Sequence, residues 1–277
     1  MNEHIEIRQS FFETEEELDK LVTLQNEVYK ERGLVFNKNG FRHWYVENPY
    51  GKAISFNAFD GEKMVAHYVC VAKKMMIEDR LVDGILSMAT VTHPDYRGRG
   101  LFKTLAKKTY DYARNSGYEF VIGVANANSF SGFMKYFPFQ FVSQLDVKIG
   151  YGRKVVIDGK KTFYGYWDED ALQWRCRNTY SYSGNNIIGT YGKYARTLMG
   201  CFDLDISILT NIPRAKCSFK PMLYIGLGGK PRGFYVSIPK FVKRPPFNLI
   251  FMDLTGGSLP TITKDNVFFQ LFDFDVA

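Results

Sequence analysis

The sequence predicts an α+β fold, in which helices flank a mixed and mostly antiparallel sheet and a strand-rich region follows. Three alternating stretches, 53–59, 63–74 and 81–92, predict an antiparallel meander, because Asp60-Gly61 is a typical hairpin turn between the first two. After Pro94 apolar residues recur four apart, which predicts a helix ending at Gly117. The first half therefore combines strands with helices.

Near residue 150 the pattern changes, because helical periodicity largely disappears and Gly and Pro become frequent. We therefore predict two domains, residues 1–149 and residues 150–277. In the first, Thr14 and Glu17 form a capping box that begins a helix. The remaining elements expected from periodicity are helices at 14–30, 41–47, 129–136 and 169–176 and strands at 120–124, 139–149, 222–227, 233–238, 249–254 and 267–276.

The second half contains a weak internal echo of the first. Three residues recur at the same spacing 130 positions later, namely Trp44, Asn48 and Tyr50 as Trp174, Asn178 and Tyr180. One hypothesis is that the strand-rich domain is a degenerate second copy of the first, and the other is that the match is accidental. Aromatic residues around 164–182 would either pack a core or extend an acceptor site.

Composition limits the class of protein. The 277 residues carry 36 Lys and Arg against 29 Asp and Glu, a net charge of +7 that favours anionic partners such as nucleic acid, a membrane surface or a phosphorylated cofactor. No apolar run approaches the roughly 20 residues of a membrane span, and the first ten residues are polar, so we expect a cytoplasmic protein. Four widely spaced cysteines predict buried free thiols and no metal site.

The most informative segment runs from Thr90 to Lys103, where a strand turns into a helix. Glycines at 98 and 100 remove Cβ atoms, so backbone amides can approach a ligand at a helix N-terminus. Five cations and no acid lie between positions 97 and 108: Arg97, Arg99, Lys103, Lys107 and Lys108. This segment predicts a phosphate-binding turn.

The motif Arg-x-x-Gly-x-Gly/Ala, with Arg97 and Gly100 at its first positions, resembles that of the GNAT superfamily of acyl-CoA N-acyltransferases. Phe102 at the last position departs from the pattern and would crowd a pyrophosphate. The resemblance covers about residues 5–148, since the preceding meander and the following strand, Asn-bearing loop and helix also agree. It implies a GNAT-like fold in the first domain. If the second domain is a degenerate copy of the first, it would be a second GNAT-like lobe.

The resemblance further implies acetyl-CoA as acyl donor and no metal. Backbone groups of three strand residues would bind the pantetheine arm: Thr90, Val91 and Thr92. Asn126 would steady the same arm. The pyrophosphate would be held by Arg97 and by the amides of Gly98, Arg99, Gly100, Leu101, Phe102 and Lys103.

Residues for proton transfer are less clear. In the family, a tyrosine of the helix that follows the Asn-bearing loop is often the general acid, and alignment on Phe139 places Met134 at that position. Tyr136 would be the general acid only if the local register of the helix differed. No carboxylate occupies the middle of strand 81–92, which leaves Asp83, otherwise a turn-exposed residue. His67 suits proton acceptance as a neutral imidazole, but a structural histidine is the alternative.

These observations lead to an N-acetyltransferase acting on the primary amine of a small acceptor, with an amino sugar as one candidate. Direct transfer in a ternary complex is expected, because no activated cysteine stands out. The alternative is a non-catalytic acyl-CoA-binding or scaffold protein. Nucleic-acid binding rests on net charge alone, so we expect neither nucleic-acid nor membrane partners. The sequence does not determine the oligomeric state.

Overall fold

The computed structural model describes residues 5–33, 35–157, 159–177, 180–183, 186–191, 195–200, 220–238 and 246–274. The chain forms two compact units, each assembled from separated stretches. The first comprises residues 1–73, 83–122 and 252–258, and the second comprises residues 74–82, 123–251 and 259–277. The division of the chain into residues 1–149 and 150–277 stays a prediction.

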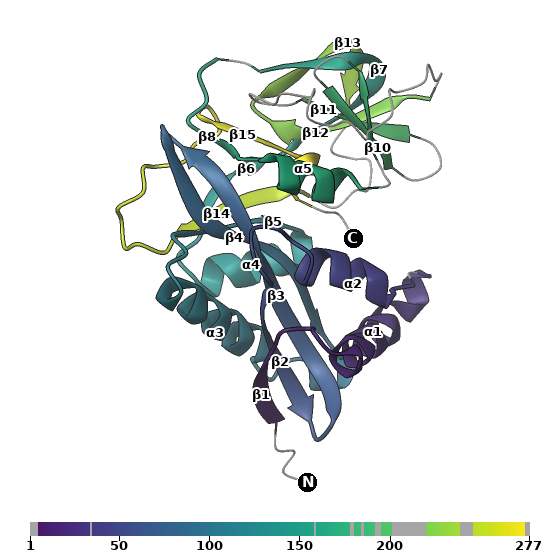
Figure 1. Cartoon of the computed structure of the whole chain (residues 1–277), viewed down its shortest axis with the longest axis vertical. Helices are drawn as coiled ribbons and strands as arrows, with labels where there is room; N and C mark the ends of the chain where they lie inside the picture. The colour runs from purple at the N-terminus through teal and green to yellow at the C-terminus, as the bar shows by residue number, and fades with distance from the viewer. Residues whose placement is uncertain are drawn as a thin grey trace. The chain divides into compact units, whose positions relative to one another are not determined.

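The first unit is a twisted sheet with helices on both faces (Figure 1). Its strands lie in the order β1-β2-β3-β4. The hairpin of β2 and β3 pairs antiparallel with Asn57 opposite His67. Tyr45 of α2 contacts His67, whereas Tyr110 of α3 contacts the next residue of β3, Tyr68. Because successive strand residues point to opposite faces, α2 and α3 cover opposite sides of the sheet. The elements of this part of the chain are β1 (Ile5–Ser10), α1 (Glu15–Tyr29), α2 (Lys38–Tyr45), β2 (Ile54–Asp60), β3 (Lys63–Ile77), β4 (Arg80–Thr92), α3 (Leu101–Asn115) and β5 (Phe120–Ala125).

Local chemistry explains the helix boundaries. The Thr14 side chain accepts a hydrogen bond from the Glu17 N–H at 3.2 Å and so caps α1. Leu18, Leu21 and Leu24 of α1 are buried at helical spacing. Gly117, with φ +86°, lies just after α3 and permits the chain to leave the helix. The cap, the buried leucines and the end of α3 match the prediction, but of the predicted capping box the structure shows only the Thr14 half, because Glu17 Oε1 accepts a hydrogen bond from the Phe11 N–H at 3.3 Å.

The second unit is strand-rich, as predicted for the second half of the chain. Strand β7 lies between β12 and β13, with antiparallel pairing on both sides. The pairs β11–β12 and β15–β8 are parallel, so the sheet is mixed. Its core includes a cluster of buried residues, Val155, Ile188, Leu198, Met222 and Tyr224. The elements from here on are α4 (Ala127–Tyr136), β6 (Gln140–Gln144), β7 (Asp146–Ile157), β8 (Phe163–Gly165), α5 (Glu169–Cys176), β9 (Tyr180–Ser183), β10 (Asn186–Tyr191), β11 (Ala195–Gly200), β12 (Met222–Leu227), β13 (Gly229–Ser237), β14 (Asn248–Asp253) and β15 (Val267–Gln270).

The α+β prediction is confirmed, and several elements differ in detail. The predicted strand 139–149 is two strands, β6 and β7, which separate at Leu145. Strand β15 ends at Gln270 because the Asp273 carboxylate accepts a hydrogen bond from the Gln270 N–H at 3.0 Å and closes a short turn. Strand β1 and the short strands β8–β11 were not predicted.

The internal echo is only partly visible. Trp44 lies in α2 and Trp174 lies in α5, each near the C-terminal end of a short helix. Asn178 falls outside the described residues, as does the side chain of Tyr180. Duplication therefore stays a hypothesis.

Candidate functional site

The turn between β4 and α3 is built on two glycines in the left-handed region. Gly98 has φ +75° and Gly100 has φ +72°, a conformation in which other residues are strained. A Cβ added at either glycine would meet no atom within 4 Å, so the turn is open to solvent on this side. Within the described chain, neither glycine N–H has a hydrogen-bond partner and no side chain caps α3. The N–H groups of Gly98, Gly100 and Leu101 are thus available to an anion at the start of α3.

Cationic side chains surround this turn and also stabilise it. The Arg97 Nε donates to the Thr92 carbonyl at 3.3 Å, and the Arg99 Nη2 donates to the Asp95 carbonyl at 3.2 Å. The Arg99 guanidinium also lies 4.8 Å from the centroid of the Tyr96 ring. Both arginines and Lys103 are exposed. The turn therefore concentrates positive charge where the helix dipole is also positive.

A buried chain of hydroxyl groups holds α3 against the sheet. The Tyr68 hydroxyl lies 2.5 Å from the Tyr110 hydroxyl and 2.8 Å from Ser87 Oγ, which joins β3 to α3 and β4. Burial raises the pKa of Tyr68 and Tyr110 well above 10, so both phenols stay protonated. The Phe102 ring packs edge-on against Tyr68, with centroids 6.0 Å apart. Phe102 thus packs toward the sheet. Its side chain therefore does not crowd the space at the turn where a pyrophosphate would bind.

The end of β4 is fixed to the β2–β3 hairpin. The His93 N–H donates to the Val65 carbonyl at 2.9 Å, and the Tyr96 hydroxyl donates to Asp60 Oδ2 at 2.6 Å. Val91 is buried, whereas Thr90 and Thr92 are half-buried. The structure therefore holds Thr90 to Thr92, the strand residues predicted to bind pantetheine, in the same unit as the residues predicted to bind the pyrophosphate, whereas Asn126, predicted to steady the same arm, belongs to the second unit.

His67 is fully buried beneath α2 in a polar cluster. Its Nδ1 lies 2.7 Å from Asn57 Oδ1, and its Nε2 lies 3.4 Å from the Tyr45 hydroxyl. Ser55 Oγ also approaches Nδ1, at 3.4 Å. Burial lowers the pKa of His67 to about 3, so the imidazole is neutral at physiological pH. With no exposed surface, it has no direct access to an acceptor amine in this conformation.

Asp83 lies at the opposite end of β4 from the turn. Seven residues separate it from Thr90, which at about 3.3 Å per residue is roughly 23 Å along the strand. Its side chain is exposed, and its carbonyl accepts a hydrogen bond from the Glu119 N–H at 2.9 Å. Direct contact between Asp83 and a thioester held at Thr90–Thr92 is therefore difficult to achieve.

Asn126 and Tyr136 belong to the second unit and lie at the two ends of α4. The Asn126 Oδ1 caps this helix by accepting hydrogen bonds from the N–H groups of Asn128 at 2.9 Å and Ser129 at 3.1 Å. Tyr136 is 42% exposed, and Met134 is 37% exposed. The ten residues of α4 place Tyr136 about 15 Å from Asn126. The side-chain oxygen of Asn126 is therefore used in helix capping, whereas its side-chain nitrogen can donate to another partner.

Comparison with known proteins identifies the family. Residues 12–137 match the family model described as an acetyltransferase (GNAT) domain. They are a GNAT domain. No curated protein matches the sequence.

Solved structures extend the fold comparison beyond the GNAT domain. One is a conserved protein from Enterococcus faecalis V583, a probable N-acyltransferase, with TM-score 0.58 and 7% identity, covering 91% of this chain and 73% of that one. Another is a GCN5-related N-acetyltransferase from Kribbella flavida, with TM-score 0.54 and 10% identity, covering 89% of this chain and 71% of that one. At such low identity these likenesses show the fold alone. By its GNAT domain, the protein is an acyltransferase.

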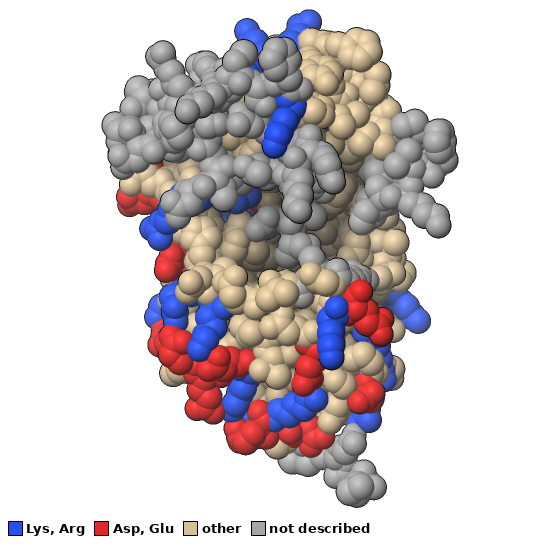
Figure 2. All heavy atoms as spheres, turned by 90° about the vertical axis from the view of Figure 1, so that its right-hand side faces the viewer, with Lys and Arg blue, Asp and Glu red and all other residues tan. Residues whose placement is uncertain are grey.

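The charged surface of the GNAT domain carries both signs. Figure 2 shows Lys and Arg interspersed with Asp and Glu over the end formed by α1 and α2. Glu15 pairs with both Lys38 and Arg42, and Lys20 pairs with Glu62. This face is therefore not a basic patch of the kind that nucleic acid would require.

Two features of the GNAT domain were not predicted from the sequence. The Tyr68–Tyr110 pair joins residues 42 apart, and the cluster around His67 joins α2, β2 and β3. Three polar residues, Ser55, Asn57 and His67, interrupt strands that are otherwise apolar, and this pattern could have indicated the buried polar cluster.

Neither Cys70 nor Cys176 has the exposure of a nucleophile, since both are buried, and burial raises the pKa of each to about 12.

Among the described residues, no three His, Cys, Asp or Glu side chains are grouped to hold a metal ion. None of the described helices has the length and apolar character needed to cross a membrane.

Proposed function

We propose that this acyltransferase moves an acetyl group from acetyl-CoA to the primary amine of a small acceptor, by direct transfer in a ternary complex. The observation that carries the proposal is the turn from Arg97 to Lys103. It combines two open glycines, an uncapped helix N-terminus and three exposed cations. These are the properties that a pyrophosphate requires, and they support a CoA thioester as donor.

The residues at the end of β4 also fit the proposed binding of CoA. Thr90 and Thr92 are half-buried at the end of β4, next to the turn, which supports the proposal that backbone groups there pair with the two amides of a pantetheine arm. Tyr68 and Phe102 pack beneath the turn and keep its amides oriented before the ligand binds. The donor would thus be held by preformed backbone geometry.

In the proposed reaction the lone pair of a neutral amine attacks the thioester carbonyl carbon. The C–N bond forms, the C–S bond breaks, the amine loses one proton and the departing sulfur gains one, which yields an amide and free CoA without any redox change. The buried Cys70 and Cys176 do not suit an acyl-enzyme intermediate, and Cys201 and Cys217 lie outside the described residues. Direct transfer is therefore the simpler route.

For proton transfer we propose Tyr136 as the acid, because it is the exposed candidate on α4. Asp83 stays the candidate base from the sequence, but at roughly 23 Å along β4 from Thr90 it would need a chain of several waters to reach a thioester held there. His67 is better suited to a supporting role, because its pKa is lowered to about 3 and its ring is fully buried. Water is then the simplest acceptor of the amine proton.

For the acceptor we propose a small primary amine, with an amino sugar as the first class to test. Tyr164, Tyr166 and Trp167 are half-buried in the second unit and offer aromatic faces suited to sugar C–H groups. The net charge of +7 disfavours polycationic acceptors such as polyamines. We further propose that the protein acts in the cytoplasm, where acetyl-CoA is available.

The test is release of free thiol from acetyl-CoA with a panel of amino sugars, amino acids and polyamines. Direct transfer predicts intersecting lines in two-substrate kinetics, whereas parallel lines would indicate an acyl-enzyme. Tyr136→Phe should lower kcat and leave CoA affinity unchanged, while Tyr112→Phe, a phenol 39% exposed on α3, serves as the control. Tight CoA binding without turnover on any amine would favour a non-catalytic CoA-binding protein.

A further inference from the structure

Strand β13 of the second unit presents its even-numbered residues to one outer face, although Gly233 and Ser237 are also exposed. The residues at its even-numbered positions are all exposed: Lys230, Arg232, Phe234 and Val236. The intervening Tyr235 packs against the buried cluster of Val155, Ile188 and Tyr224, and its hydroxyl donates to the Gly152 carbonyl at 2.7 Å. The outer face is thus the one that carries large apolar side chains away from the core, which is the reverse of the usual arrangement.

The neighbouring strand continues this outer face. Phe234 is paired with Tyr151, and Val236 is paired with Ile149. Phe234 is 72% exposed, Tyr151 is 56% exposed and Val236 is 48% exposed. With about 200 Å² for each aromatic side chain, the two rings alone present roughly 250 Å² of surface to solvent. Such a contiguous patch marks an interaction site rather than scattered apolar residues.

Cations adjoin the apolar patch on the same face. Arg232 is paired with Lys154, and Lys230 is paired with Val156, immediately beyond a bulge that separates Arg232 from Phe234. In the described part of β7 and β13 there are five cations, Lys148, Arg153, Lys154, Lys230 and Arg232, against one acid, Asp146. Asp146 lies 3.3 Å from Lys148.

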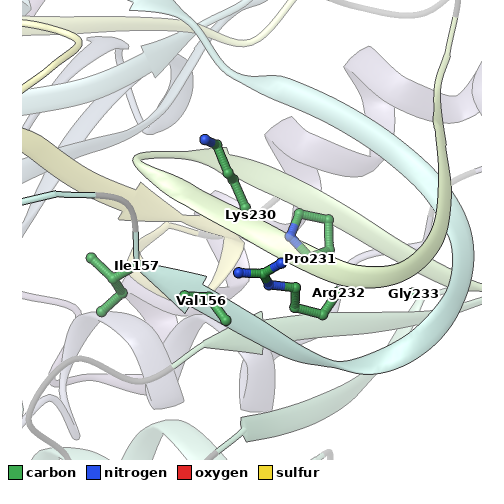
Figure 3. A pocket seen from close by; sticks show the side chains of 6 residues that line it. All are labelled: Val156, Ile157, Lys230, Pro231, Arg232 and Gly233. Carbon is green, nitrogen blue, oxygen red and sulfur yellow. The ribbon is translucent and has the colours of Figure 1, made fainter.

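A pocket of about 410 Å³ opens at the cationic end of this face. Lys230, Pro231 and Arg232 contribute from β13, and Val156 and Ile157 contribute from β7 (Figure 3). The lining combines two long cationic side chains with aliphatic ones, which suits a group that carries both negative charge and hydrocarbon.

We infer that the β7–β13 outer face, formed by residues 149–156 and 230–236, docks the protein on an anionic lipid surface. The exposed aromatic and aliphatic side chains would enter the boundary between headgroups and acyl chains, and the adjacent Lys and Arg side chains would reach the anionic headgroups. Charge complementarity selects this occupant. A second copy of the chain would oppose cations to cations, and an acidic peptide would leave Phe234 and Val236 without an apolar partner.

Such binding is peripheral and needs no membrane-spanning segment. It goes beyond the proposed acyl transfer and does not depend on it. It differs from the expectation of no membrane partner, because an exposed strand face can bind a membrane surface without an apolar span.

The test is co-sedimentation of the full chain with vesicles of phosphatidylcholine alone and of phosphatidylcholine with phosphatidylglycerol, at low and physiological salt. We expect binding only to the anionic vesicles and weaker binding in salt. The double variant Lys230→Gln/Arg232→Gln should bind about 25-fold more weakly, at about fivefold for each cation. Phe234→Ser should also weaken binding and leave thermal stability unchanged, since the side chain is exposed.

Matched controls are Lys52→Gln/Lys63→Gln, which removes two cations from the first unit, and Phe11→Ser, which removes a phenylalanine that is 44% exposed there. Both controls should bind vesicles like the wild type. Equal loss in the controls would reduce the effect to net charge and overturn the proposal. So would the absence of vesicle binding, binding of polyglutamate in preference to vesicles, or a dimer that Phe234→Ser dissociates.

Discussion

Replacing Gly100 by aspartate tests the proposed phosphate turn. Gly100 has φ +72°, so any side chain there costs about 1–2 kcal/mol of backbone strain, and its N–H loses the open approach. A carboxylate about 5 Å from two pyrophosphate charges adds repulsion of about 332/(80 × 5), or ~0.8 kcal/mol for each charge, and hence about 1.7 kcal/mol in total. This corresponds to CoA binding weakened by about 15-fold from repulsion alone.

Gly117→Asp is the matched control for this change. Gly117 lies at the other end of the same helix and has φ +86°, and a Cβ added there would meet no atom within 4 Å, so strain and added charge are the same. Isothermal titration with CoA at low salt measures affinity, and thermal melting measures the loss of stability common to both variants. Unchanged CoA affinity in Gly100→Asp, or an equal loss in Gly117→Asp, would refute the assignment of the turn.

Three further predictions concern the interior. Tyr68→Phe should lower the free energy of unfolding by about 1–3 kcal/mol, because it removes a buried hydroxyl that hydrogen-bonds both Tyr110 and Ser87, and chemical denaturation with a Tyr110→Phe double-mutant cycle would show coupling between the two tyrosines. Burial lowers the pKa of His67 from 6.5 to about 3, so the unfolded state binds the extra proton as pH falls below about 6.5. The free energy of unfolding should therefore drop by about 2–3 kcal/mol between pH 6.5 and pH 4.5 and do so less in His67→Gln; an identical slope in both would contradict the assignment. Since burial raises the pKa of Cys70 and Cys176 to about 12, peptide mapping after alkylation at pH 8 should find both protected until the chain unfolds.

Much of the fold is local in origin and could be predicted. The cap at Thr14 and the turn at Gly61 depend on residues within a few positions of one another, so a sequence pattern is enough. The same holds for the functional turn, where the left-handed conformation of Gly98 and Gly100 follows from a short motif.

What could not be predicted depends on contacts between distant parts of the chain. Residues 252–258 belong to the first unit, more than 100 positions after the predicted boundary at 149. No local pattern indicates that Tyr68 meets Tyr110 or that His67 meets Asn57 from a facing strand. For the same reason, the sequence could not distinguish a catalytic histidine from a buried one, since burial is a property of the packed sheet and helix.

Amide hydrogen exchange with and without CoA would test the central claim most directly. The account predicts that CoA slows exchange of the amides of Gly98, Gly100 and Leu101, which lie at the uncapped start of α3, and leaves the segment around Gly117 unchanged. Full exchange at the turn in the presence of saturating CoA would contradict it.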